Sequence, residues 1–175
     1  MHGSGSGTMR ILIVSTPVGP LGSGVGGGVE LTLVGLVRGL TALGHDVAVV
    51  APAGSTSPGC PVIEVEGTLQ PSIQHVERDV PISMPPDPVL GGMWDAVLER
   101  QHEVDVVLNL SYDWLPLHLT PLLDVPVAHL ISMASMSDAM DLALDRVARL
   151  RPESLAVHGR AQAATFGHLP HLGPA

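Results

Sequence analysis

Short apolar segments alternate with longer amphipathic segments along most of this chain. The short ones are rich in β-branched residues, which is typical of strands buried in a parallel sheet. The predicted strands are residues 10–15, 45–51, 62–65, 105–110, 125–131 and 155–158.

A helix is predicted after the first strand because its apolar residues recur at steps of four and three, which places them on one helical face. These residues are Val29, Leu33, Leu36, Leu40 and Leu43, and Gly44 stands where such a helix would end. Gly35 and Gly39 lie inside the helix, so we expect its backbone to pack closely against the sheet. Similar spacing predicts helices over 93–103, from Leu115, over 137–150 with Ser137 as its cap, and over 160–166.

Residues 67–92 interrupt this alternation with a series of prolines. They are too broken for a helix and form a long connection between two elements. The segment predicts a surface excursion, with a short strand near 80–84.

Strands that alternate with helices after short connections predict a single α/β domain. We expect a Rossmann-like parallel sheet with helices on both faces. In such sheets ligands bind beyond the carboxyl ends of the strands. The candidate functional segments therefore follow Ser15, Ala51, Leu110, Ile131 and His158.

Composition and charge remove several classes of function. The chain has 175 residues, a formal net charge of -9 and no lysine, so nucleic acid is an unsuitable partner, and Walker A and Schiff-base chemistry are excluded. No apolar run approaches the roughly 20 residues of a membrane helix, so we expect no membrane insertion and a cytoplasmic location. The lone Cys60 has no internal disulfide partner, and residues 1–8 have the composition of an appended flexible linker. The fold is expected to begin at Met9.

The glycine-rich segment 16–28 allows three interpretations. It ends where a helix begins, and a helix N-terminus with close glycine backbone binds anions such as a diphosphate. The pattern GxGxxG at Gly22, Gly24 and Gly27 is also formally a dinucleotide fingerprint, although prolines separate it from the strand and the second strand lacks the acidic ribose ligand. The third interpretation is a mobile loop without a ligand.

The run from Met9 to Pro52 carries a family resemblance. A strand is followed by a loop ending in Gly27-Gly28, an amphipathic helix, and Gly44-His45-Asp46-Val47 leading into the second strand. This arrangement resembles the opening of family 4 retaining glycosyltransferases of the GT-B fold. The strings STPVGPLGSG, GGGVELTL, YDWLPL and AHLISM are similar to bacterial glucosyltransferases that act on UDP-glucose and tetrahydrobiopterin. The resemblance extends to about Phe166 but covers only the first half of such an enzyme.

The resemblance implies an N-terminal, acceptor-side domain, with the donor-binding C-terminal domain absent and the 175-residue chain inactive by itself. It implies that Gly26, Gly27 and Gly28 contact the donor diphosphate. Many members have a histidine where this chain has Ser132, and His129 lies three residues earlier. Ser132 and His129 are therefore the catalytic candidates, with a buried structural histidine as the alternative for His129.

The tripeptide Tyr112-Asp113-Trp114 follows the fourth predicted strand and matches a stretch that faces the cleft in the family. We expect it to bind the acceptor, with Asp113 accepting N–H groups of a pterin edge and Tyr112 or Trp114 stacking on the ring. The alternative for Trp114 is packing in the core.

The expected ligands are thus a nucleotide sugar and a small-molecule acceptor, without a cofactor or a metal. His168 and His171 form a potential metal pair, but they lie in a Gly/Pro tail without a suitable third ligand. Two other functions remain open from the sequence. One is a non-catalytic module that binds a small ligand or a partner domain, and the other is a dinucleotide-binding oxidoreductase fragment.

Overall fold

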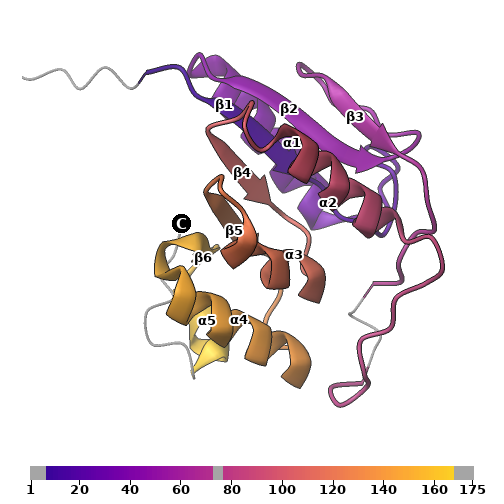
Figure 1. Cartoon of the computed structure of the whole chain (residues 1–175), viewed down its shortest axis with the longest axis vertical. Helices are drawn as coiled ribbons and strands as arrows, with labels where there is room; N and C mark the ends of the chain where they lie inside the picture. Colours follow the sequence, from indigo (N-terminus) through magenta and orange to yellow (C-terminus); the bar gives the residue numbers. More distant parts are fainter. Residues whose placement is uncertain (1–6, 73–76, 168–175) are drawn as a thin grey trace, which may run out of the picture.

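Parallel strands form the centre of the computed structural model, which describes residues 7–72 and 77–167. The sheet has six strands in the order β3-β2-β1-β4-β5-β6 (Figure 1). Their bounds are β1 Arg10–Val14, β2 Asp46–Pro52, β3 Val62–Val65, β4 Val106–Asn109, β5 Val127–Ile131 and β6 Leu155–Val157. The predicted α/β, Rossmann-like fold is confirmed, and each predicted strand is present to within two residues at either end.

Helices cover both faces of this sheet. They are α1 Gly28–Ala42, α2 Val89–Arg100, α3 Trp114–Leu119, α4 Asp138–Leu150 and α5 Arg160–Ala163, with short 3-10 turns η2 Thr120–Leu122, η3 Pro152–Ser154 and η4 Ala164–Phe166. Helix α1 packs on one face through Leu33 and Val37, which belong to the same buried cluster as Ile13 of β1 and Val49 of β2. Helices α2, α3 and α4 pack on the opposite face, where Leu12, Val107 and Ile131 are buried. Burying each large apolar side chain contributes roughly 1.5–3 kcal/mol.

Two details predicted for α1 are wrong. Leu43 lies beyond the last helical residue and is 73% exposed, so it does not belong to the buried face. Gly35 and Gly39 are exposed, and a Cβ at either would meet nothing within 4 Å. The close approach to the sheet occurs instead at Gly92 of α2, where a Cβ would lie 2.7 Å from Val65 Cγ1.

The segment before α2 also differs from the prediction. No strand forms at residues 80–84, and α2 begins at Val89 instead of 93. The earlier start has a tertiary cause, because Val89 and Leu90 are completely buried in the core between α2 and the sheet. Residues 77–88 run from beside the start of α4, where Arg78 contacts Asp138, back to the β3 side of the sheet, where residues 87 and 88 lie next to Thr68 (Figure 1).

Most of the linker predicted at residues 1–8 lies outside the described residues, as do His168 and His171. Among the residues that are described, no helix is long and apolar enough to cross a membrane.

Candidate functional site

A cleft of about 510 Å³ opens at the carboxyl ends of the strands, as the fold predicts. The segments that follow β1, β4, β5 and β6 all line this main cleft, whereas the segment directly after β2 does not. The residues that line it include Gly26, Gly27, Gly28, Tyr112, Asp113, Ser132 and His158. The structure therefore brings most of the predicted donor and acceptor residues to one hollow.

The glycine segment forms one side of the main cleft, and a carboxylate from α1 holds it in place. Glu30 is only 7% exposed. Its Oε2 accepts the N–H groups of Gly22 at 2.8 Å and Gly24 at 3.2 Å, and its Oε1 accepts the Gly26 N–H at 2.6 Å. Hydrogen bonds to an ionised group are roughly twice as strong as neutral ones. The Glu30 carboxylate therefore holds the loop in place. Three amides of the loop already donate hydrogen bonds to this side chain.

Sequence reasoning missed Glu30. The available signal was the string Gly27-Gly28-Val29-Glu30, which places an acidic residue in the first turn of a helix directly after glycines. In the local sequence this position looks the same as any acidic side chain that favours a helix N-terminus.

Of the three glycines predicted to bind the donor diphosphate, only one has a backbone N–H that remains available to a ligand. The Gly26 N–H donates to Glu30, and the Gly27 N–H donates to the Gly24 carbonyl at 3.2 Å. The Gly28 N–H, in the first residue of α1, has no acceptor among the described residues. The helix dipole of this 15-residue helix favours negative charge at the same point. An anion in the main cleft would therefore be bound chiefly at Gly28.

The structure divides the predicted acceptor tripeptide between two hollows. Tyr112 and Asp113 line the main cleft, while Trp114 lines only a neighbouring smaller pocket. Trp114 is 36% exposed and stacks on the His118 ring at 4.5 Å between centroids, so the core-packing alternative for Trp114 is wrong. The buried tryptophan of the chain is Trp94 in α2, at 1% exposed.

Asp113 is both a helix cap and a cleft residue. Its Oδ1 accepts the Leu115 N–H at 3.3 Å, which caps α3. Burial raises the pKa of this carboxyl above its ordinary value. Burial also raises the pKa of the neighbouring Tyr112 phenol, with a smaller contribution from the negative charge of Asp141. Tyr112 is therefore a neutral hydroxyl at physiological pH.

The two catalytic candidates have different positions. Ser132 lines the main cleft. His129 lies beneath it, at 2% exposed, with Nδ1 2.9 Å from Asn109 Nδ2 and Nε2 2.7 Å from Thr120 Oγ1. The Asn109 amide donates to Nδ1, so the proton resides on Nε2. The Thr120 hydroxyl accepts that N–H and itself donates to the Pro116 carbonyl.

Burial lowers the pKa of His129 to about 3, so the ring remains neutral at physiological pH. Both of its nitrogens are occupied, which favours the structural interpretation of this residue. The histidine that does line the main cleft is His158, at the carboxyl end of β6. The sequence identified the position after this strand as functional but gave His158 no role.

Metal ligation finds no support in the part of the chain that the structure describes, where no three His, Cys, Asp or Glu side chains are placed to hold an ion. Cys60 has Ser57 Oγ 3.3 Å from its sulfur and does not line the main cleft.

Comparison with known proteins adds no family. A scan against protein-family models finds no match to this chain, and a search of curated proteins finds no similar sequence.

Proposed function

We propose that this chain is the acceptor-side domain of a retaining glycosyltransferase, which transfers a hexose from a nucleotide sugar to a small acceptor. One observation carries the proposal. The main cleft places an anion-binding helix N-terminus at Gly28 and the polar side chains of Tyr112, Asp113 and Ser132 around one open space of about 510 Å³. Donor and acceptor must lie in one such space for a sugar to pass between them.

The donor side fits a role shared with another domain. Helix α1 offers one amide and its dipole to a diphosphate, and Glu30 keeps the adjoining loop rigid. Among the residues that the structure describes, no arginine lines the main cleft. Stabilising the charge of a departing diphosphate needs several preorganised donors, so a second domain would supply the rest.

The dinucleotide alternative is less compatible with the same residues. A pyrophosphate that used the Gly22 and Gly24 amides would first have to displace the Glu30 carboxylate. Strand β2 also ends in Val50-Ala51-Pro52, without an acidic side chain for a ribose. A non-catalytic ligand-binding module would use the main cleft in the same way, and turnover distinguishes it from an enzyme.

Binding of the donor is the direct test. We would record amide NMR spectra of the 15N-labelled chain while adding UDP-glucose, UDP or NAD. The expected result is a shift of the amide resonances of residues 28 and 29, at the start of α1, with UDP-glucose and UDP. A Gly28→Glu variant should lose this response because it puts a negative charge at the proposed diphosphate site. Gly35→Glu is the matched control, because it places the same charge on the same helix in open space.

Two outcomes would contradict the proposal. Equal responses of the Gly28→Glu and Gly35→Glu variants would show that the nucleotide does not use the α1 N-terminus. A stronger response to NAD than to UDP-glucose would favour the dinucleotide alternative. We also expect no sugar transfer when the 175-residue chain is mixed with UDP-glucose and a reduced pterin, and product above background would show that no second domain is needed.

A further inference from the structure

The two faces of the sheet are covered unequally over β4, β5 and β6. Side chains that point towards α2, α3 and α4 are buried there, among them Val107, Ile131 and Val157. Their neighbours along the same strands point to the face that carries α1, and all of these are only partly buried. They form a set that we call the bare half of the sheet: Val106, Leu108, Ala128, Leu130 and Ala156.

Helix α1 covers only the other half of this face. The residues of β1 and β2 beneath it, such as Ile13 and Val49, are completely buried. Helices α2, α3 and α4 all pack on the opposite face (Figure 1). Among the described residues, no helix covers the bare half. Parallel sheets are normally covered on both faces because their strands are apolar on both. The bare half therefore lacks a layer.

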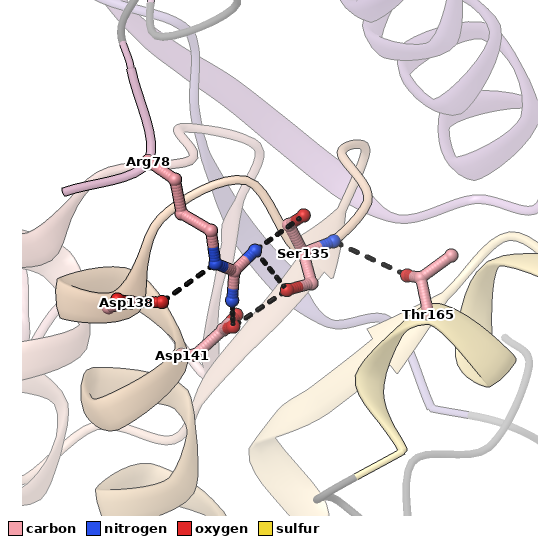
Figure 2. A network of polar contacts seen from close by, with 5 residues as sticks. All are labelled: Arg78, Ser135, Asp138, Asp141 and Thr165. Atoms are coloured by element: carbon pink, nitrogen blue, oxygen red, sulfur yellow. Dashed lines mark hydrogen bonds and ion pairs between the residues drawn. The ribbon is translucent and has the colours of Figure 1, made fainter.

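The side that carries α4, in contrast, is tied together within one chain. Figure 2 shows Arg78, whose Nε contacts Asp138 Oδ1 at 2.7 Å and whose Nη2 contacts Asp141 Oδ2 at 2.5 Å. Asp141 also accepts the Ser135 hydroxyl at 2.6 Å, and the Ser135 N–H donates to Thr165 Oγ1. These contacts join the segment before α2 to the first turn of α4 and to η4. The surface that needs a partner is therefore the one around α1.

The outer surface of α1 is itself apolar. A surface helix normally turns charged side chains to water. Helix α1 has two charged residues, and one of them, Glu30, is engaged by the glycine loop, which leaves Arg38. Its outward positions include Gly35, Ala42 and Leu31, which is 77% exposed. The centre of a protein interface is depleted of charge in the same way. The outer surface of α1 therefore suits burial against another apolar surface.

The bare half has the width of one helix. Three strands span about 10 Å, and a helix with its side chains is roughly 10–12 Å in diameter. We propose that this chain forms a two-fold dimer, in which the outer surface of α1 of each copy covers the bare half of the other copy's sheet. A two-fold axis that runs along the strands, midway between the two sheets, produces this arrangement. The inference is independent of the proposed function.

The spacing along α1 fits the contact that this axis creates between the two helices. The axis preserves the direction of the strands, so the two α1 helices lie side by side and parallel. Leu36 shares a cluster with Leu108, so its flank of α1 faces the bare half. On that flank Thr32, Leu36, Gly39 and Leu43 recur at steps of four, three and four, as in the seam between two parallel helices. Each would meet its own symmetry mate.

The area is sufficient for a specific dimer. A 15-residue helix is about 22 Å long and roughly 10 Å wide, so one helix lying on a sheet removes on the order of 450 Å² from water, counting both surfaces. Two such contacts and the contact between the helices together bury roughly 1,300 Å². Specific interfaces begin at about 1,200 Å². We therefore expect a dimer that dissociates on dilution. Both main clefts open at the same edge of this dimer and remain accessible.

Sedimentation equilibrium of the whole chain measures the association. We expect twice the mass of one chain at high concentration and a reversible shift to the monomer on dilution. Leu31→Arg should weaken the dimer at least about tenfold, because the interface contains this residue twice. Leu142→Arg is the matched control, since Leu142 is 71% exposed on α4, on the other side of the sheet. Equal dissociation constants of these two variants would overturn the proposal.

The salt dependence separates this interface from one made of ion pairs. Each copy has a formal net charge of -9, which opposes association, while the proposed surfaces are apolar apart from Arg38. Raising the salt concentration from about 0.05 M to about 0.5 M should therefore tighten the dimer by screening the repulsion. A dimer that loosens over this range would contradict the proposal.

A cysteine pair tests the parallel arrangement of the helices. In a Cys60→Ser background, Leu43→Cys places one thiol on each α1 seam, and its exposed position allows the chain to fold. Oxidised glutathione should then yield a disulfide-linked dimer, because symmetry mates on this seam lie within disulfide reach. Leu142→Cys in the same background is the control. Equal crosslinking of the two variants would refute the arrangement.

Other occupants of the bare half predict different results. A wild-type chain that stays monomeric at about 1 mM would overturn the proposal. A shortened chain ending at Gly167 should dimerise as tightly as the whole chain. If only the shortened chain formed a dimer, residues 168–175 would be the occupant and a second copy would not. Gly35→Glu should be monomeric and yet keep its response to UDP-glucose, since Gly35 does not line the main cleft. A dimer of wild-type strength in this variant would refute the interface.

Discussion

Replacing Glu30 by Gln tests whether a carboxylate braces the glycine segment. The change keeps the size of the side chain but exchanges one acceptor oxygen for an NH₂ donor. Oε1 and Oε2 both accept backbone N–H groups, so one set of bonds must be lost in either orientation of the amide. If the amide oxygen of the new glutamine still accepts the N–H of the half-buried Gly26, the hydrogen bonds from the N–H groups of Gly22 and Gly24 are lost. Both of these residues are exposed. Water can hydrate those two amides, which limits the cost.

The magnitude follows from these contacts. A hydrogen bond to a charged group contributes about 1.5–3 kcal/mol, and rehydration recovers part of it when the donor is exposed. We therefore expect the free energy of unfolding to fall by roughly 1–3 kcal/mol. For a chain of this size, that lowers Tm by about 2–4 °C per kcal/mol.

Urea unfolding followed by circular dichroism gives the free energy, with Glu153→Gln as the control because Glu153 is an exposed acid on η3. Hydrogen exchange of the glycine amides adds a local measurement, and those of Gly22, Gly24 and Gly26 should exchange faster in Glu30→Gln. If the two variants unfolded within about 0.5 kcal/mol of each other and glycine exchange did not change, the carboxylate would not brace the loop.

Two further predictions concern stability. The folded-state pKa of His129 is lowered to about 3, so below its ordinary value of 6.5 the unfolded chain binds a proton that the folded chain does not. His129 should therefore lower the free energy of unfolding by up to about 1.4 kcal/mol per pH unit as the pH falls from 6.5 towards 3, and a His129→Gln variant measured between pH 7 and 5 should lack this slope. If the wild type and His129→Gln had the same pH dependence of the free energy of unfolding, His129 would not be kept neutral by the folded chain. Ser137 precedes α4 but makes no side-chain capping bond, so Ser137→Ala should change the free energy of unfolding by less than about 0.5 kcal/mol, and a loss near the typical 1 kcal/mol would show that the cap forms in solution.

Much of the fold was predictable because its strands and helices follow local patterns. Apolar β-branched runs predicted every strand of the sheet, and the helical spacing of α1 and α4 predicted their buried residues Leu33, Met140 and Leu144. The candidate site followed from the same reasoning, since the carboxyl ends of parallel strands meet at one edge. That is why Gly28, Asp113 and Ser132 could be assigned to one cleft before their positions were known.

The failures occur where distant residues decide the outcome. The prolines of residues 67–92 argued against a helix there, yet α2 begins at Val89 because Val89 and Leu90 are buried against the sheet. Gly92 was not distinguishable from Gly35 by local sequence, but only Gly92 meets a side chain of another element.

The sequence by itself determined which segments of this protein become strands or helices and at which edge of the sheet a ligand would lie. Those properties depend on side-chain periodicity and backbone preference, which are encoded within a few neighbouring residues. The tertiary structure decided that Glu30 fills the glycine loop, that His129 lies beneath the cleft, and that Arg78 reaches Asp138 and Asp141. The energies of these contacts depend on the burial and spacing of groups that the sequence separates, and only the packed fold brings such groups within hydrogen-bond distance.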